Sequence, residues 1–144
     1  MGPRIKIFLD SDVALDHLSD RQPFAEYAHR LFALAELGEI TICLSSLSFS
    51  NLYYILRKLK GHADTLTLLA DLKKLVRVSS VSESEIQAAL SSNFRDFEDA
   101  IQHFSAVAEG EILAIVTRNK VDYLNSQVPV LSPEEFLLNQ KSHS

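Results

Sequence analysis

The chain has 144 residues, of which 47% are hydrophobic, and carries a formal net charge of −5 at pH 7. This length fits one domain with a full core, which we expect to span residues 1–144 with an ordered part at about 4–138. Four Gly, four Pro and the lack of low-complexity runs exclude long linkers and disorder. The negative charge provides no general attraction for phosphate, so a nucleic-acid partner would need a local basic patch or metal ions.

Localisation is suggested by the cysteine content and by the apolar runs. The one cysteine, Cys43, lies in the run ITICL and is typical of a buried free thiol, which excludes an internal disulfide. No apolar run approaches the roughly 18 residues that a membrane span needs, and the first residues lack an export signal. We therefore expect a cytoplasmic protein that does not bind membranes.

Five short runs rich in β-branched residues predict strands, at residues 5–9, 40–44, 75–78, 112–117 and 128–131. Several are apolar at successive positions, which is typical of strands covered on both faces. The segments between them have helical periodicity. A helix is predicted over 22–37, with Pro23 near its start, Gly38 beyond its end, and an apolar stripe formed by Phe24, Tyr27, Leu31 and Ala35.

Two later helix starts carry the capping-box pattern, Ser82 with Glu85 and Ser132 with Glu135. Alternation of strands and helices predicts an α/β fold of three layers, in which a five-stranded parallel sheet lies between helices. Ligands of such sheets bind beyond the carboxyl ends of the strands. Asp10, the segment 45–51 and the segment 117–122 each follow a predicted strand, so we expect them to meet at one crevice.

Acidic residues are placed where this crevice is expected. Asp10 and Asp12 follow the first strand, and Asp96 and Asp99 stand one turn apart at the start of a helix. Asp96 also fits a purely structural N-cap. The apolar spacing of the run AIQHFSAVA, which begins after Asp99, turns that carboxylate inward.

Carboxylates from separate strand ends repel one another unless a cation lies between them, and hard ions such as Mg²⁺ or Mn²⁺ prefer oxygen ligands. The histidines give no competing zinc-like spacing, and we expect surface or packing roles for all five: His17, His29, His62, His103 and His143.

Four segments together resemble the successive motifs of PIN domains: KIFLDSDVALDHLSDRQPF, SSLSFSNLYYILRK, DFEDAIQHFSAVAEG and AIVTRNKVDY. They occur in the family order and span nearly the whole chain. The resemblance is to the branch in which an Asn follows the serine-rich turn. It implies a Rossmann-like five-stranded parallel sheet, an acidic pocket for Mg²⁺ or Mn²⁺, and metal-dependent cleavage of RNA. It also implies a role as the toxin of a toxin–antitoxin pair, like the VapC-type ribonucleases, with a cognate antitoxin and a homodimer as partners.

The functional residues of the family can be matched to single positions of this chain. Asp10 matches the acid that closes the first strand, Asp99 the acid before A-I in the central helix, and Asp96 an acid of this branch. The chain departs from the family at two positions. It has Asn51 where many members have Glu, and Asn119 where many members have the Asp of the sequence T-R-D. An amide adds no charge, so these two positions weaken the expected hold on a cation. Asn51 also fits a residue that bonds to backbone near a helix start.

The resemblance therefore implies metal ligation by Asp10, Asp99 and Asp96. Asp122, three residues after Asn119, and Asp12, near Asp10, are expected to compensate for missing charge. Asp122 and Asn51 complete the expected catalytic set. Contacts to substrate phosphate are expected from five residues: Ser11, Asn119, Thr117, Arg118 and Arg57.

Three other functions compete with a nuclease. The stretch FLDSDV is similar to the D-x-D motif of haloacid dehalogenase-type phosphotransferases, but the Gly-Asp pair of that family is missing. Receiver domains need an Asp after the third strand, where this chain reads VSSVSES. The remaining alternative is a catalytically impaired PIN-like module that binds RNA or a protein, and the two asparagines favour it.

Overall fold

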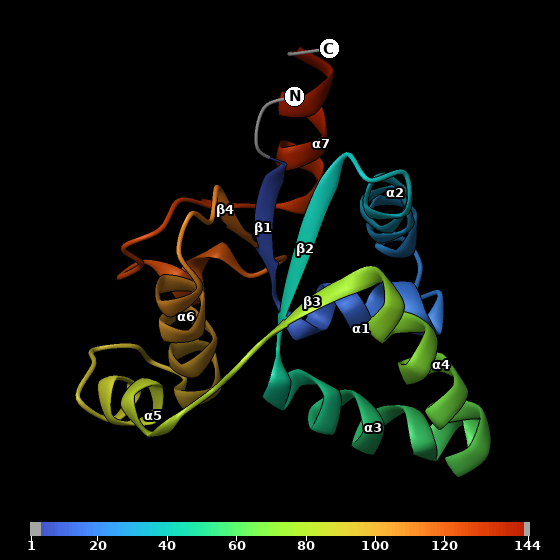
Figure 1. The fold of residues 1–144 in the computed structure, drawn as a ribbon, viewed down its shortest axis with the longest axis horizontal. Coiled ribbons are helices and arrows are strands. Elements are labelled where there is room, and N and C mark those ends of the chain that lie inside the picture. Colours follow the sequence, from blue (N-terminus) through green and yellow to red (C-terminus); the bar gives the residue numbers. More distant parts are fainter. Residues whose placement is uncertain (1–3, 143–144) are drawn as a thin grey trace.

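The computed structural model describes residues 4–142; the outermost residues of the expected domain, including His143, lie outside this range. Its centre is a parallel sheet in the order β3-β2-β1-β4-β5 (Figure 1). All five predicted strands are present, although their bounds differ. They are β1 (Ile5–Leu9), β2 (Ile40–Ser45), β3 (Val76–Ser79), β4 (Ala114–Val116) and β5 (Val130–Leu131).

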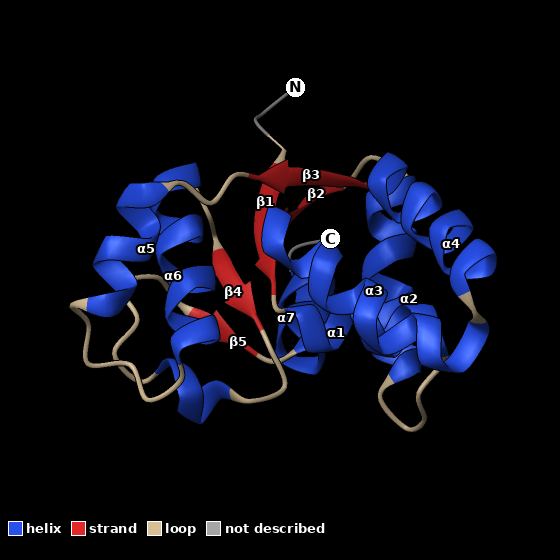
Figure 2. Cartoon of the chain, turned by 90° about the horizontal axis from the view of Figure 1, so that it is seen from below, coloured by secondary structure: helices blue, strands red, loops and turns tan. Residues whose placement is uncertain are grey.

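Helices cover both faces of the sheet, which confirms the predicted three-layer α/β fold. They are α1 (Ser11–Ser19), α2 (Ala25–Glu36), α3 (Ser46–Lys60), α4 (His62–Leu75), α5 (Glu83–Leu90), α6 (Phe97–Glu109) and α7 (Pro133–Ser142), with a 3₁₀ turn η1 (Lys120–Tyr123). Seen from below, α5 and α6 lie on one side of the strands and α1 to α4 on the other (Figure 2). None of the helices in the described part of the chain is long and apolar enough to cross a membrane.

The two cores follow from the alternation of side chains along the strands. Ile7, Leu9 and Ile42 face the larger core, which receives Phe32 from α2 and Phe136 from α7. On the opposite face, Phe8, Cys43 and Ile115 pack with Ala106 of α6 and with Tyr123 of η1. The central strands β1, β2 and β4 are therefore buried on both sides, as their continuous apolar runs predicted, whereas Arg77 and Val78 of the edge strand β3 are exposed. Cys43 is a buried free thiol, which confirms its predicted state.

The central position of β1 brings the functional candidates to one edge. Phe8 of β1 pairs with Cys43 of β2 and with Ile115 of β4, and the amide of Asp10 donates to the carbonyl of Val116 at 3.0 Å. Parallel neighbours end at the same edge of a sheet. Residues that follow β1, β2 and β4 therefore surround Asp10.

Several predicted element boundaries are wrong. The helix predicted over 22–37 begins at Ala25, after a turn at residues 22–24, because the residue before a proline is disfavoured in helical conformation. Of the predicted stripe, Leu31 is buried and Ala35 packs against the larger core, but Phe24 is exposed. Ala25, Ala28 and Phe32 complete the buried face. The helix ends near Gly38 as expected, with φ of 79° at that glycine. Both capping boxes are present: Glu85 binds the amide of Ser82, and Glu135 that of Ser132.

Candidate active site

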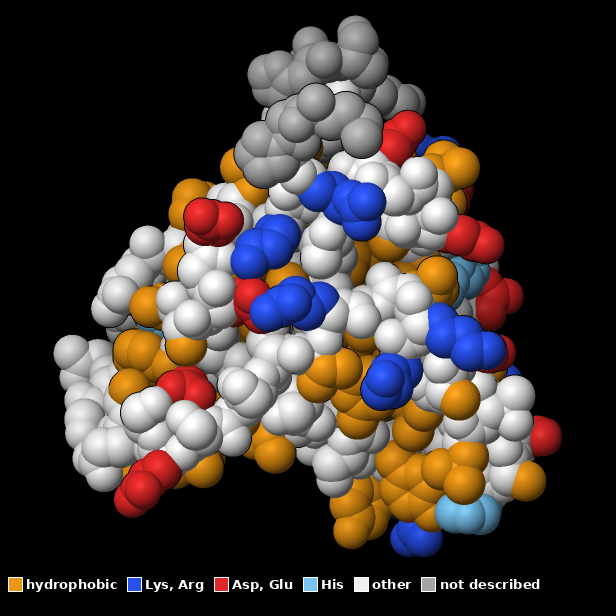
Figure 3. Space-filling model, viewed as in Figure 1, with side chains coloured by type: hydrophobic (Ala, Val, Ile, Leu, Met, Phe, Trp, Pro, Cys, Tyr) orange, Lys and Arg blue, Asp and Glu red, His pale blue; other side chains and the backbone are white. Residues whose placement is uncertain are grey.

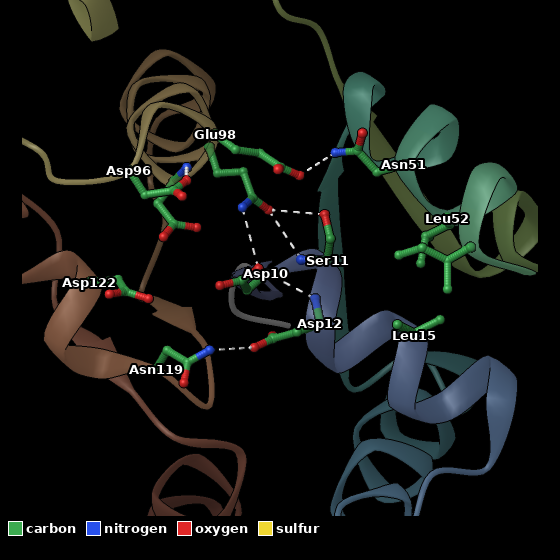
Figure 4. A pocket seen from close by; sticks show the side chains of 13 residues that line it. Asp10, Ser11, Asp12, Leu15, Asn51, Leu52, Asp96, Glu98, Asn119 and Asp122 are labelled. Carbon is green, nitrogen blue, oxygen red and sulfur yellow. Dashed lines mark hydrogen bonds between the residues drawn. The ribbon is translucent and has the colours of Figure 1, made fainter.

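A pocket of about 250 Å³ opens at the carboxyl ends of β1, β2 and β4. It lies between α6 and α3, where the lower outline of the molecule is notched (Figure 3). The three segments that were expected to meet at one crevice do meet here. The polar side chains of its wall, most of them labelled in Figure 4, are Asp10, Ser11, Asp12, Asn51, Asp96, Glu98, Asp99, Gln102, Asn119 and Asp122.

Asp10 is the best-anchored acid of the pocket and is only 7% exposed. Its Oδ2 accepts hydrogen bonds from Thr117 Oγ1 at 2.8 Å and from the Tyr123 hydroxyl at 3.1 Å. Its Oδ1 accepts from Gln102 Nε2 at 3.3 Å and caps α1 through the amide of Asp12 at 3.4 Å. These four donors fix the direction of the carboxylate.

Tyr123 links the two central acids. Its hydroxyl also lies 3.4 Å from Asp99 Oδ1, so one proton serves both carboxylates. Burial, reinforced by the negative charges of Asp10 and Asp99, raises the pKa of Tyr123, which keeps the hydroxyl a donor. Burial also raises the pKa of Asp99 from 3.8 to about 7, and repulsion from Asp10 adds to the shift. The pocket therefore holds Asp99 at an electrostatic cost in the metal-free protein.

Asp12 and Asn119 form the wall opposite α6. Asn119 Nδ2 donates to Asp12 Oδ2 at 3.1 Å, while the buried Oδ1 of Asp12 has no hydrogen-bond partner in the described part of the chain. Burial and the charge of Asp10 raise the pKa of Asp12 to about 7. A buried carboxylate oxygen without a donor is unfavourable unless a cation or a proton satisfies it.

The other wall is formed where α3 meets α6. Asn51 Nδ2 donates to Glu98 Oε1 across the gap between the two helices (Figure 4). Asp96 is the N-cap of α6, as its structural interpretation predicted, and its Oδ1 accepts from the amide of Asp99 at 3.0 Å. It lines the pocket at the same time.

Three residues expected to contact substrate do not line the pocket. Thr117 is fully buried and donates to Asp10. Arg118 forms two hydrogen bonds with the buried Asp16, at 2.7 and 3.3 Å, and lies over the ring of Phe24. Arg57 lies over the rings of Tyr53 and Tyr54, farther along α3. Ser11, Asn119 and the five expected catalytic residues do line it.

Sequence reasoning assigned no role to Glu98, Gln102 or Tyr123. Gln102 bridges two elements, because its Oε1 accepts from the amide of Ser11 at 3.1 Å while its Nε2 donates to Asp10. One signal was available for it: Gln102 lies three residues after Asp99 and so shares its helix face. Tyr123 had no such signal, since an aromatic residue after a strand also fits a core position.

The residues of the pocket fit a hard divalent cation. All its candidate donors are carboxylate, amide or hydroxyl oxygens, and they include the carboxylate of Asp12, whose Oδ1 lacks a hydrogen-bond partner within the described residues. Within residues 4–142, no three side chains of His, Cys, Asp or Glu are arranged to hold a metal ion by themselves. Mg²⁺ does not need such a cage, because it keeps several waters and uses one or two carboxylates together with substrate phosphate.

Comparison with known proteins gives one family and several relatives. The family model described as PIN domain matches residues 6–121. Ribonuclease VapC1 of Aquifex aeolicus (strain VF5) is 25% identical over 139 residues, which cover 91% of this chain and 92% of the relative.

Two solved structures have a similar fold. VapBC2 from Rickettsia felis, bound to a DNA fragment from its promoter, matches with a TM-score of 0.64 and 16% identity over 89% of this chain and 98% of the other. VapC20 of Mycobacterium tuberculosis, a toxin that cleaves the sarcin-ricin loop, matches with a TM-score of 0.60 and 20% identity over 76% and 86%. At these identities the likeness supports the fold.

Proposed function

The chain belongs to the PIN domain family, and from this premise we propose that it is an endoribonuclease that hydrolyses RNA phosphodiester bonds with Mg²⁺ or Mn²⁺. The observation that carries the proposal is the convergence of Asp10, Asp96, Asp99 and Asp122 on one pocket. Holding these acids together is costly without a cation, as the pKa of about 7 at Asp99 indicates. The family likeness to Ribonuclease VapC1 supports RNA as the substrate.

In this proposal Asp10 and Asp99 hold the cation, with Asp96 beside them. A bound divalent cation would supply Lewis acidity toward the scissile phosphate and neutralise its charge. The chain's own residues prepare the site for it. Thr117, Gln102 and Tyr123 fix the carboxylate of Asp10 in one direction, and Asn119 holds Asp12. Asp122, at the pocket wall, adds negative charge that orients water near the phosphate.

We propose that the protein acts as the toxin of a toxin–antitoxin pair in the cytoplasm, with a cognate antitoxin and a second copy of the chain as partners. Two observations support this role. The curated relative is a VapC protein that matches nearly its whole length, and one structural neighbour is the VapBC2 assembly. An antitoxin that inserts a basic side chain among the pocket acids would satisfy their charge and block the site.

A catalytically impaired module that binds RNA or protein is the second candidate. Asn51 and Asn119 favour it, as does the lack of a three-ligand cluster within the described residues. Five aspartates at one pocket favour the nuclease, because a module without a cation gains nothing from their repulsion. Binding of metal separates the two candidates.

The test is calorimetric titration of Mn²⁺ into the wild type and into Asp10→Asn, because Asn retains the capping ability of Asp10. Asp64→Asn, an exposed acid in the first turn of α4, is the matched control. We expect saturable binding in the wild type and the control, with a large loss in Asp10→Asn. No binding to the wild type at millimolar Mn²⁺ would contradict the nuclease and favour the impaired module.

A further inference from the structure

Glu98 lies at the mouth of the acidic pocket and is held there by another helix. It occupies the first turn of α6, beside the inward-facing Asp99. Asn51, from the second turn of α3, donates its amide hydrogen to Glu98 Oε1 (Figure 4). This hydrogen bond joins side chains 47 residues apart and spans the gap between α3 and α6. Glu98 Oε2 has no hydrogen-bond partner within residues 4–142.

The direction of this hydrogen bond separates the roles of the two residues. Asn51 contributes a donor and no charge, whereas Glu98 contributes a carboxylate with one oxygen still available. The neighbouring acids are each engaged differently: Asp96 caps α6 through Oδ1, and Asp99 is bonded by Tyr123. Glu98 is thus the acid of this helix that is positioned from the opposite wall of the pocket.

A purely structural role explains the hydrogen bond between Asn51 and Glu98 less well than a role in the pocket does. Glu98 is exposed, and a hydrogen bond at an exposed position contributes little to stability. Negative charge in the first turn already interacts favourably with the helix dipole, without any help from α3. A carboxylate at this position also adds repulsion with Asp96 and Asp10 to a site that is already acidic.

We propose that Glu98 contributes a carboxylate to the cation site and that Asn51 is the positioning residue that directs it there. The inference rests on the proposed function, since it concerns the same cation. It assigns the available oxygen of Glu98 to the cation or to a water beside it. Asn51 acts through Glu98 instead of through its own oxygen.

An isosteric exchange tests the pair. Glu98→Gln removes the charge and keeps the shape, so Mn²⁺ affinity measured by calorimetry should fall about tenfold or more. Asn51→Ala keeps the charge and removes the clamp, and a smaller loss is expected. The double variant Asn51→Asp with Glu98→Gln keeps an amide-to-carboxylate hydrogen bond but moves the carboxylate to α3. It should return the affinity to within about threefold of the wild type.

Glu83→Gln is the matched control, because it removes a first-turn acid from α5, away from the pocket. Its Mn²⁺ affinity should equal that of the wild type. Unchanged affinity in Glu98→Gln, with saturable binding in the wild type, would overturn this inference and leave the proposed function standing. Unchanged affinity in Asn51→Ala would overturn the positioning role. No saturable binding in the wild type would overturn the proposed function and the inference together.

Discussion

At the residue scale, Asp99 bears much of the electrostatic cost of the acidic pocket. Burial and neighbouring acids raise its pKa from 3.8 to about 7, so between these pH values the folded protein keeps a proton that the unfolded chain releases. Stability from this group is therefore present at low pH and is lost as the pH rises through about 7. A bound cation would reverse that loss by replacing the proton.

Asp99→Asn should therefore stabilise the metal-free protein at pH 8, by about 1–2 kcal/mol once solvent screening of this partly exposed group is discounted. Cleavage of RNA should be abolished by the same change. Urea unfolding of both proteins, at pH 8 and below pH 3.8, measures the first effect. The two proteins should unfold alike at the lower pH. Equal stability at pH 8 would show that the pocket does not strain Asp99.

Thr117 offers a second prediction, because its hydroxyl is buried and donates to Asp10 at 2.8 Å. Thr117→Val should lower kcat about tenfold with little change in KM, since it loosens Asp10 and touches no substrate. Loss of a buried donor should also cost about 1–2 kcal/mol of stability. Thr65→Val is the control, because Thr65 is equally buried and its hydroxyl has no partner within residues 4–142. A raised KM with normal kcat would instead return Thr117 to the substrate-contacting role first expected.

The sequence predicted the aspartates that line the pocket, but it did not predict which residues would orient them. Asp10, Asp99 and Asp122 stand after strands or on an amphipathic helix, and both signals are local. The role of Tyr123 depends on the distance between β4 and α6, and that of Glu98 on the approach of α3. Neither distance is encoded in local spacing, so these residues emerge only from the folded chain.

At the scale of single elements, α3 connects the pocket to a surface of mixed character. Asn51 and Ile55 line the pocket, and Lys58 continues the same face by helical spacing. Tyr54 is 57% exposed and lies under the guanidinium of Arg57. Hydrophobic side chains gather beside Lys and Arg at the lower right, over α3 and α4 (Figure 3). Aromatic rings interleaved with cations suit single-stranded nucleic acid.

Arg57→Ala with Lys58→Ala should therefore weaken RNA binding and flatten its salt dependence. Each lost phosphate contact should reduce the slope of log K against log salt by about 0.7. Filter binding of the metal-free protein at several salt concentrations measures the slope. Lys73→Ala with Lys74→Ala removes equal charge from the far end of α4 and should change little. Equal slopes in all three proteins would mean that α3 does not contact RNA.

Element boundaries show where tertiary contacts take precedence over local pattern. The strand predicted over 112–117 is reduced to Ala114–Val116, yet Leu113 still donates to Lys6 and Thr117 to Leu131. The ladder therefore continues beyond the regular strand. The strand predicted over 128–131 is similarly reduced to Val130–Leu131 because its neighbour β4 is short and offers few partners. Apolar runs predicted that these strands exist, while their lengths depend on pairing.

At the scale of the whole molecule, a substitution in α7 can show whether the chain unfolds as one unit. Phe136 is fully buried in the larger core with residues of α1 to α4. Phe136→Ala should cost about 3–5 kcal/mol and lower the unfolding midpoint without separating it into two steps. In each of the two proteins, far-UV circular dichroism and tyrosine fluorescence should give the same urea unfolding curve. Separate transitions for the two probes would contradict the single domain expected from the sequence.

The central position of β1 also has a consequence for the newly made chain. β1 is complete at Leu9, but its neighbour β4 begins only at Ala114. At usual rates of about 5–20 residues per second, the ribosome needs about 5–20 s to make the segment between them. During that interval Asp10 lacks the hydrogen bonds from Thr117 and Tyr123 that orient it in the folded protein. The acidic pocket is therefore incomplete on the ribosome until the segment that carries Thr117 and Tyr123 has been made.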